Sequence, residues 1–307
     1  MRKHKILCAL LAGCIAACTP FALDTAKLDP PGTRTVAPLK SERPLIALAL
    51  GAGGARGFAH VGVIKALEEA GIVPDIVTGT SSGAIVAALY AGGYSGAQLE
   101  DLASDISETS LIDFSLFGKG WVRGEALQEF VNRALGHRPI EQLAKPFAVV
   151  VTRAGSGEMI VFNRGDPGLA VRASSAVPDL FIPPVIDGVE YIDGGLSTPV
   201  PARVARAMGA DFVIAVDLTR YWRSRERAEA DLLDADFVIR PETVRTRMLD
   251  FTAKFQNMKA GEEAGREAVP AILLRLQQKS KNVAAAPAAG EALPAQPRTP
   301  VAVPEGG

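Results

Sequence analysis

The segment Gly79-Thr80-Ser81-Ser82-Gly83 fits the pattern G-x-S-x-G, in which a serine stands between two glycines. Strand-like residues precede it and helix-like residues follow it, which is the context that this motif requires. On such a tight strand-to-helix turn, the Oγ of Ser81 stands clear of the sheet, and the Ser82 amide faces a developing oxyanion. The pattern therefore predicts a nucleophilic serine. A turn that only caps a helix is the alternative.

A second glycine cluster follows the apolar run 45–50 and reads GAGGARG from Gly51 to Gly57. Backbone amides at the start of the helix expected next attract negative charge, as in phosphate-binding loops. A dinucleotide-binding loop needs the pattern G-x-G-x-x-G, but the sixth position counted from Gly51 is Arg56. The frame therefore fails, and a nucleotide-dependent oxidoreductase would also leave the serine motif unexplained.

A serine nucleophile needs a general base, and the histidine content restricts the candidates. The chain contains only His4, His60 and His137, and none of them follows the best acidic candidate, Asp193. The order serine, acid, histidine that α/β-hydrolases use is therefore impossible. Asp193 precedes two glycines, so its carboxylate could approach another loop, but Asp-Gly is equally typical of a type I′ hairpin turn. We interpret His60 and His137 as structural.

Alternating strands and helices must position these residues. Residues 45–50 form a continuous apolar run, typical of a strand buried on both faces, and helical spacing follows over 57–70. Further strands are predicted at 75–78, 147–152, 158–162, 211–218 and 236–239, and further helices at 83–91, 122–135, 200–208 and 243–280. This alternation predicts an α/β protein with a largely parallel sheet covered on both faces. We expect one domain over residues 44–282.

The amino-terminal residues carry the features of a bacterial secretion signal. Residues 1–5 are positively charged, and the apolar stretch 6–18 is too short to span a bilayer. Two segments resemble the lipobox, in which a cysteine is lipidated, and they end at Cys14 and Cys18. We favour Cys18, because it leaves a hydrophobic stretch of more normal length. The alternatives are an ordinary cleaved signal and a short buried helix.

Lipidation at this position predicts a lipoprotein anchored to a membrane of the bacterial cell envelope and facing the periplasm. Residues 19–43 are rich in Pro, Thr, Asp and Lys, and we expect them to form a tether. Residues 283–307 consist mainly of Ala, Pro and Gly with few large apolar side chains. We expect this tail to be disordered.

Composition argues against several other functions. The net charge of −1 over 307 residues gives no electrostatic support for nucleic-acid binding. All three cysteines lie within the first 18 residues, so the rest of the chain contains no disulfide framework, thiolate metal site or cysteine nucleophile. Because a histidine-rich metal-binding pattern is also missing from the sequence, we expect neither a metal nor a cofactor.

Taken in order, these motifs resemble those of the patatin-like phospholipase family. The matches are the glycine loop at 51–57, His-x-Gly-Val at 60–63, the serine motif at 79–83, Ala-Ser-Ser-Ala-Val-Pro at 173–178 and Asp-Gly-Gly at 193–195. The similarity covers about residues 44–218, and several ordered motifs are far more specific than any single one. It points to bacterial members allied to the neuropathy-target-esterase group. The resemblance implies a three-layer α/β sandwich with a mostly parallel central sheet flanked by helices.

The same resemblance implies roles for individual residues. Ser81 would be the nucleophile and Asp193 its base, in a dyad that hydrolyses carboxylic esters of (phospho)lipids without a metal. Four backbone amides would hold the oxyanion, those of Gly53, Gly54, Ala55 and Ser82. The other motif residues would shape the loops: Gly51, Arg56, Gly57, Gly79, Gly83, Gly194 and Gly195. The run Leu-Ser-Thr-Pro at 196–199 departs from the family, in which many members carry Asn shortly after Asp-Gly-Gly.

Two alternatives stay open at this point. The same fold could serve as a non-catalytic, membrane-anchored interaction module, since a fold alone does not prove activity. The many large apolar residues between 107 and 121 favour ordinary core packing, with a lipid-facing lid as the alternative. As partners we expect a lipid or ester substrate and a membrane surface, but no nucleic acid. The sequence does not predict the oligomeric state.

Overall fold

The computed structural model describes residues 28–35, 38, 39, 41, 43–114, 121–220 and 225–285. The predicted signal segment 1–18, with Cys14 and Cys18, lies outside the described residues, as does the predicted tail from residue 286 onward. Within the described part, no helix is both long enough and apolar enough to cross a membrane.

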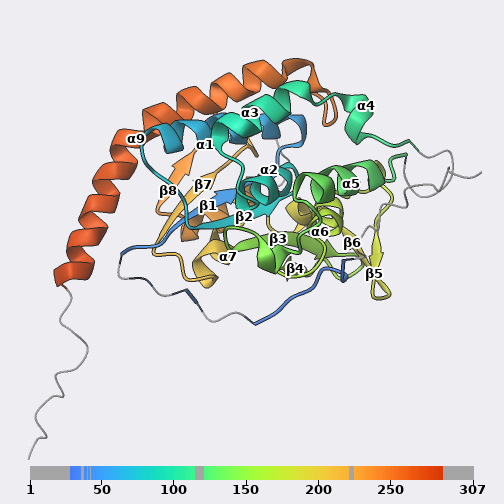
Figure 1. Ribbon diagram of the computed structural model, residues 1–307, viewed down its shortest axis with the longest axis horizontal. Helices are drawn as coiled ribbons and strands as arrows, with labels where there is room; N and C mark the ends of the chain where they lie inside the picture. Colours follow the sequence, from blue (N-terminus) through green and yellow to red (C-terminus); the bar gives the residue numbers. More distant parts are fainter. Residues whose placement is uncertain are drawn as a thin grey trace, which may run out of the picture.

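Among the described residues, one central sheet of eight strands organises the fold (Figure 1). The strands are β1 (Ile46–Leu50), β2 (Ile76–Thr80), β3 (Phe147–Arg153), β4 (Met159–Phe162), β5 (Val185–Ile186), β6 (Val189–Ile192), β7 (Phe212–Val216) and β8 (Phe237–Ile239). Their order is β5-β6-β3-β2-β1-β7-β8, and β4 also pairs with β3. The pairings from β3 through β2, β1 and β7 to β8 are parallel, whereas β4 and β6 run antiparallel to β3. The carboxyl ends of β1 and β2 therefore meet at one edge.

Helices cover both faces of this sheet. They are α1 (Ala59–Glu69), α2 (Ser82–Ala91), α3 (Gly96–Asp105), α4 (Glu108–Leu111), α5 (Glu125–Ala134), α6 (Pro167–Ser174), α7 (Ala202–Ala207), α8 (Arg225–Asp231) and α9 (Lys254–Ala285). Helices α1, α2, α3 and α9 lie on one side of the sheet, and α7 lies on the other (Figure 1). The predicted three-layer α/β sandwich with a mostly parallel sheet is confirmed.

Strand β1 shows why the sheet is buried on both faces. Leu48 and Leu50 point into the larger core, which they share with side chains of α1 and α2. Ala47 and Ala49 point to the opposite face, where they pack against small residues of α7. Alternate residues of a strand face opposite sides, so this pattern of large and small apolar residues requires a layer on each side.

Two glycines let α9 lie directly on the backbone of α1. A Cβ added to Gly62 would lie 2.0 Å from the carbonyl oxygen of Met258, and one added to Gly261 would lie 1.9 Å from that of Ala59. No side chain fits at such distances, so both positions require glycine. The carboxyl-terminal helix is thereby fixed on the helix that follows the glycine loop.

The predicted helix over 243–280 is wrong at both ends. Residues 243–250 are irregular, a 3₁₀ turn follows at Phe251–Ala253, and α9 then runs from Lys254 to Ala285. The Asp250 side chain accepts a hydrogen bond from the Thr252 amide, and such a cap starts a new helical turn. Periodicity did not reveal this start, because Met248 and Leu249 face a pocket instead of the helix–helix interface.

Part of the predicted tether packs on the domain. Gly32 forms a bridge with Arg164, the carbonyl of Asp29 accepts the amide of Asp166 at 2.8 Å, and the Leu39 amide donates to the Met208 carbonyl. The packed part of the chain therefore begins before residue 44, where the sequence predicted its start. Residues 283–285, predicted to belong to the tail, still form the end of α9.

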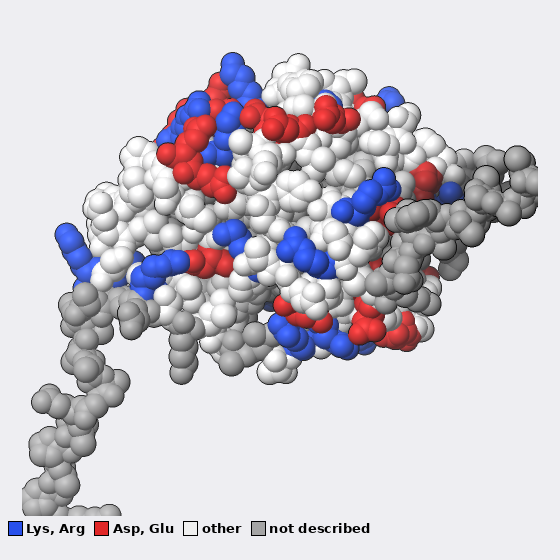
Figure 2. Space-filling model, in the orientation of Figure 1, with Lys and Arg blue, Asp and Glu red and all other residues white. Residues whose placement is uncertain are grey.

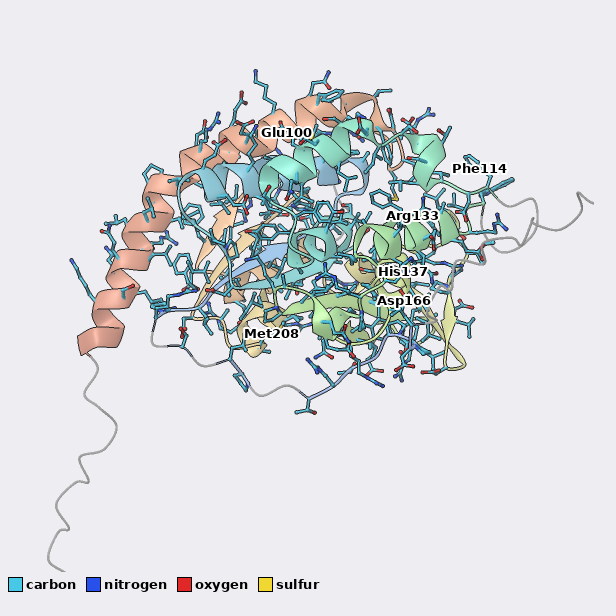
Figure 3. All side chains as sticks on the ribbon, in the orientation of Figure 1. Glu100, Phe114, Arg133, His137, Asp166 and Met208 are labelled. Atoms are coloured by element: carbon cyan, nitrogen blue, oxygen red, sulfur yellow. The ribbon has the colours of Figure 1, made fainter. Side chains whose placement is uncertain are left out.

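Residues 107–121 are packed only in part. Leu111 is buried, but Phe114 and Trp121 are 73% and 67% exposed. Phe114 points outward from the edge of the molecule near α4 (Figure 3). The predicted core packing therefore holds for Leu111 and is wrong for Phe114 and Trp121, while Leu116 and Phe117 lie outside the described residues.

Charged side chains of both signs are mixed on the face shown in Figure 2, where basic and acidic groups lie side by side along the upper edge. On α9, Lys259 pairs with Glu263 at 3.5 Å, and Arg266 pairs with Glu262 one turn away. Such pairs at i and i+4 stabilise exposed helices modestly. The mixture agrees with the net charge of −1.

Candidate active site

Ser81 lies in the turn between β2 and α2, with φ of 55° and ψ of −126°. Residues other than glycine rarely adopt a positive φ, and such strain costs about 1–3 kcal/mol unless surrounding contacts enforce it. A strained serine at a strand-to-helix elbow is the geometry in which the hydroxyl projects from the sheet. The residue lines a pocket although it is only 6% exposed.

The structure brings Ser81 and Asp193 together. The Ser81 Oγ donates to Asp193 Oδ2 at 2.6 Å, and the Gly195 amide donates to Asp193 Oδ1 at 2.7 Å. Asp193 caps a 3₁₀ turn at Gly194–Leu196, with φ of −47° and ψ of 128°. The type I′ hairpin turn, which the sequence left open, is therefore wrong, and the carboxylate faces the serine instead.

Burial controls the charge of Asp193. Its side chain is 2% exposed, and desolvation raises the pKa of its carboxyl from 3.8 to about 6. Hydrogen bonds from Ser81 and from the Gly195 amide favour the ionised form and oppose this rise. At neutral pH the group is a buried carboxylate with a much higher proton affinity than an exposed aspartate. A proton acceptor beside a serine hydroxyl requires this property.

The glycine loop lies beside the serine, and Gly54 lines the same pocket as Ser81. Gly54 has φ of 58°, which glycine adopts without strain. Nε of Arg56 donates to the carbonyl oxygen of Gly53 at 3.2 Å. Because a trans peptide directs its C=O and N–H in opposite directions, this bond turns the Gly54 amide away from Arg56. Within the described residues, the amides of Gly53 and Gly54 have no hydrogen-bond partner.

Unlike the amides of Gly53 and Gly54, the Ala55 amide already has a hydrogen-bond partner. This contradicts its predicted place in the oxyanion hole. Its N–H donates to the carbonyl oxygen of Met248 at 2.7 Å. A Cβ on Gly54 would lie 3.0 Å from the same carbonyl oxygen, so Met248 lies directly on the loop. This contact joins residues far apart in sequence, and no local pattern predicts it.

Of the two histidines outside the signal segment, His60 is structural, as its sequence position suggested. His60 is fully buried, and its Nε2 donates to the carbonyl oxygen of Gly51 at 2.7 Å. Desolvation lowers the pKa of His60 to about 4, so the ring is neutral at physiological pH. His137 follows α5 at φ of 53° (Figure 3). His60 therefore anchors the start of the glycine loop.

Motif glycines allow the loops to touch. A Cβ on Gly57 would lie 2.6 Å from the Ser82 side chain, and one on Gly83 would lie 2.2 Å from the Leu50 carbonyl oxygen. Backbone atoms similarly crowd Gly51, Gly79 and Gly194. Ser82 is the first residue of α2, where amides have no acceptor within the helix. Its amide and the glycine loop therefore flank the same elbow.

An apolar pocket of about 120 Å³ opens at Ser81. Its walls come from α1, α2, α3, α4 and α5 and from residues 248–251, with Phe58, Leu99, Leu102, Phe181, Leu249 and Phe251 among the lining side chains. Within the described residues, no charged side chain lines it. The site therefore joins a serine and a carboxylate to a cavity that fits a hydrocarbon chain.

Sequence reasoning missed two residues at this site. Met248 was placed inside a predicted helix, and no local signal marks its contact with the glycine loop. Ser174 lies within the matched stretch 173–178, but it received no role. In the structure, Ser174 Oγ accepts a hydrogen bond from the Ser81 amide at 2.8 Å. The motif match was the signal that could have identified it.

The fold is that of a three-layer α/β protein in which a serine at a strand-to-helix elbow is bonded to a buried aspartate. Among α/β proteins of this kind, the chain belongs to the patatin-like phospholipase family, whose family model matches residues 48–206. The family predicted from the order of the motifs is therefore confirmed.

Curated relatives place the chain near the NTE branch of this family. An uncharacterised NTE family protein of Mycobacterium bovis is 38% identical over 184 residues, which are 58% of this chain and 50% of that protein. Patatin-like phospholipase domain-containing protein 6 of Mus musculus is 37% identical over 182 residues, or 56% of this chain and 13% of that protein. The chain thus spans about half of the mycobacterial relative, and the predicted alliance is confirmed.

A solved structure with the same fold is that of VipD from Legionella pneumophila. The two share a TM-score of 0.54 and 16% sequence identity over 79% of this chain and 71% of that chain. At this level of identity, the similarity concerns the fold alone.

Proposed function

We propose that this protein is a serine acyl hydrolase that cleaves carboxylic ester bonds of lipids, with Ser81 as nucleophile and Asp193 as base. The hydrogen bond between Ser81 Oγ and Asp193 Oδ2, at 2.6 Å, carries the proposal. It lies at an apolar pocket that Gly54 also lines, and the amides of Gly53 and Gly54 have no partners among the described residues. These observations support a site in which nucleophile, base and anion-binding donors act together, as acyl transfer requires.

The first half of the reaction forms an acyl-enzyme. The Asp193 carboxylate takes the hydroxyl proton as Ser81 Oγ attacks the ester carbonyl. The amides of Gly53, Gly54 and Ser82 stabilise the tetrahedral oxyanion, and one such donor typically contributes about 3–4 kcal/mol. The carbon–oxygen bond to the alcohol then breaks, and Asp193 returns its proton to the leaving oxygen. Water, activated by the same carboxylate, cleaves the acyl-enzyme and restores Ser81.

The pocket supports a lipid as substrate. Apolar side chains line it, so burying a hydrocarbon chain there is favourable at roughly 0.8 kcal/mol for each methylene. A phosphate or other charged headgroup would meet no charged side chain among the described lining residues. The acyl chain therefore enters the pocket and the alcohol part stays at its mouth. Phospholipids, lysophospholipids and neutral esters all satisfy this arrangement, which corresponds to phospholipase A or lysophospholipase-type activity.

The proposal includes attachment to a membrane. A lipidated Cys18, or Cys14, would hold the domain on the periplasmic side of a bacterial membrane, close to an insoluble substrate. Support comes from the two lipobox-like segments alone, which lie outside the described residues. Radiolabelled palmitate incorporated by the wild type and lost with Cys18→Ala or Cys14→Ala would identify the site.

Activity with and without the serine tests the proposed reaction. The full-length wild type should hydrolyse a soluble chromogenic ester and react with a fluorophosphonate probe, and Ser81→Ala should do neither. Ser280→Ala is the matched control, because Ser280 lies on α9 and its hydroxyl bonds only the Leu276 carbonyl. Full activity of Ser81→Ala would refute the assignment. Absence of turnover in the wild type over a panel of lipids would favour the non-catalytic interaction module.

A further inference from the structure

We propose that Ser174 is a positioning residue whose hydroxyl holds the Ser81 elbow at hydrogen-bonding distance from Asp193. The inference rests on the proposed function of Ser81 and Asp193, and it assigns a role to a third buried side chain. Ser174 ends α6 and is fully buried, so its hydroxyl has no access to solvent.

The Ser174 hydroxyl connects two adjacent strands of the sheet. Its Oγ accepts the Ser81 amide at 2.8 Å and donates to the Val150 carbonyl oxygen at 2.6 Å. A serine hydroxyl has one donor and can also accept, so this position uses both capacities. The result is a continuous chain of hydrogen bonds from the elbow after β2 to the middle of β3.

This chain replaces a direct bond of the sheet. The Val77 amide donates to the Pro146 carbonyl at 3.0 Å, at the start of the parallel pairing of β2 with β3. In a parallel ladder the bonds repeat every second residue, so the Ser81 amide falls opposite the Val150 carbonyl. The hydroxyl of Ser174 occupies the space between them. It therefore keeps Ser81 farther from β3 than a continued ladder would.

The same part of the fold also holds Asp193. The Asp193 amide donates to the carbonyl oxygen of Ala176, just beyond Ser174, at 2.9 Å. A Cβ on Gly194 would lie 2.1 Å from the Val150 carbonyl oxygen. The backbone that follows Asp193 therefore packs on the very carbonyl that Ser174 binds. Nucleophile and base are both positioned against the end of α6 and the middle of β3.

Removal of the hydroxyl should displace the nucleophile. The Ser81 amide and the Val150 carbonyl, both buried, would lose their partner, and unpaired buried groups are costly. The ladder then closes between them and draws Ser81 toward β3. The distance from Ser81 Oγ to Asp193 Oδ2 grows, and a misplacement of about 1 Å can reduce a rate roughly 100-fold. The pocket walls are unaffected, so substrate binding should change little.

Steady-state kinetics of the full-length protein on a soluble short-chain ester provide the test. Ser174→Ala should lower kcat by about 30- to 100-fold with KM changed less than about twofold. Ser174→Cys keeps a weak donor and acceptor and should recover part of kcat. Thr78→Val is the control, because Thr78 Oγ1 is a buried hydroxyl that donates only to the Pro201 carbonyl. It should lower the melting temperature but preserve kcat.

An unchanged kcat in Ser174→Ala, or an equal loss in Thr78→Val, overturns the inference. A crystal structure of Ser174→Ala gives a second measurement: a Ser81–Asp193 distance beyond about 3.5 Å supports positioning, and the original 2.6 Å refutes it. If the wild type hydrolyses no ester, the proposed function fails, and this distance alone decides the role of Ser174. Should Ser174→Ala not fold, both measurements are made on Ser174→Cys.

Discussion

The hydroxyl of Ser81 donates directly to the carboxylate of Asp193 at 2.6 Å, although 112 positions separate the two residues in the chain. No imidazole lies between them, and the buried His60 is bonded to the Gly51 carbonyl instead. In the proposed reaction, the carboxylate must therefore accept the proton itself. Its proton affinity then determines the pH at which the proposed reaction runs. Burial of the ionised carboxylate also lowers the stability of the folded state.

Activity should rise with pH through the titration of Asp193. Only the ionised carboxylate accepts the Ser81 proton, and burial raises the pKa of this group to about 6. We expect kcat/KM to increase about tenfold per pH unit below pH 6 and to level off above it. A profile of initial rates from pH 4 to 9 on a soluble, non-ionising ester measures this. A half-maximum near pH 4 would show that the carboxyl titrates like an exposed aspartate.

Asp193→Asn should stabilise the fold at alkaline pH while abolishing activity. The native pKa of about 6 exceeds the unfolded value of 3.8, so the contribution of this group to stability is full below pH 4 and is lost as pH rises through 6. Asparagine carries no charge and can still accept from Gly195. We expect the free energy of unfolding to rise by up to about 3 kcal/mol at pH 8 and to change little at pH 4.

Urea unfolding of the wild type and of Asp193→Asn at both pH values measures the difference. Asp231 provides a matched control, because burial also raises its pKa to about 6 and its carboxylate binds only the Val200 amide. Asp231→Asn should show a similar dependence of stability on pH and retain activity. Destabilisation of Asp193→Asn at pH 8 would mean that the carboxylate gains more from its hydrogen bonds than it loses on burial.

Loss of the hydrogen bond from His60 to the Gly51 carbonyl should lower both the stability of the fold and kcat. His60→Leu removes the donor and leaves a buried carbonyl unpaired, which typically costs about 1–3 kcal/mol. His60→Gln can place an amide N–H near the position of Nε2 and should retain most of the stability and of kcat. Thermal unfolding and kcat of both variants are the measurements. Equal behaviour of the two variants would show that packing of the ring, not its hydrogen bond, supports the loop.

The sequence predicted those parts of the molecule in which the local residue pattern reflects the contacts that the residues make in the fold. The strand β1 is a continuous apolar run because both its faces are buried, and the elbow at Ser81 needs its flanking glycines for backbone contacts. The absence of a histidine after Asp193 also restricts the candidates for the base from the sequence alone. A short stretch of adjacent residues is enough to predict each of these features.

Features that depend on distant contacts could not be predicted. Asp193 followed by glycine fits a hairpin turn as well as an active-site loop, and only the approach of Ser81 decides between them. The sequence predicted that the Ala55 amide could hold the oxyanion, but in the structure this amide donates to the Met248 carbonyl. Met248 itself looked helical, because periodicity cannot distinguish a side chain facing a helix from one facing a pocket. The start of α9 at Lys254 was missed for the same reason.

The glycine loop depends on parts of the chain that are synthesised long after it. The Gly51 amide donates to the Val216 carbonyl in β7, and α1 is covered by α9, which runs to Ala285. A fragment ending at residue 206, where the family match ends, would contain Ser81 and Asp193 but neither of these supports. The two reactive residues are therefore translated well before the loop acquires its final shape. By the proposed mechanism, we expect a nascent chain to hydrolyse no ester until α9 has left the ribosome.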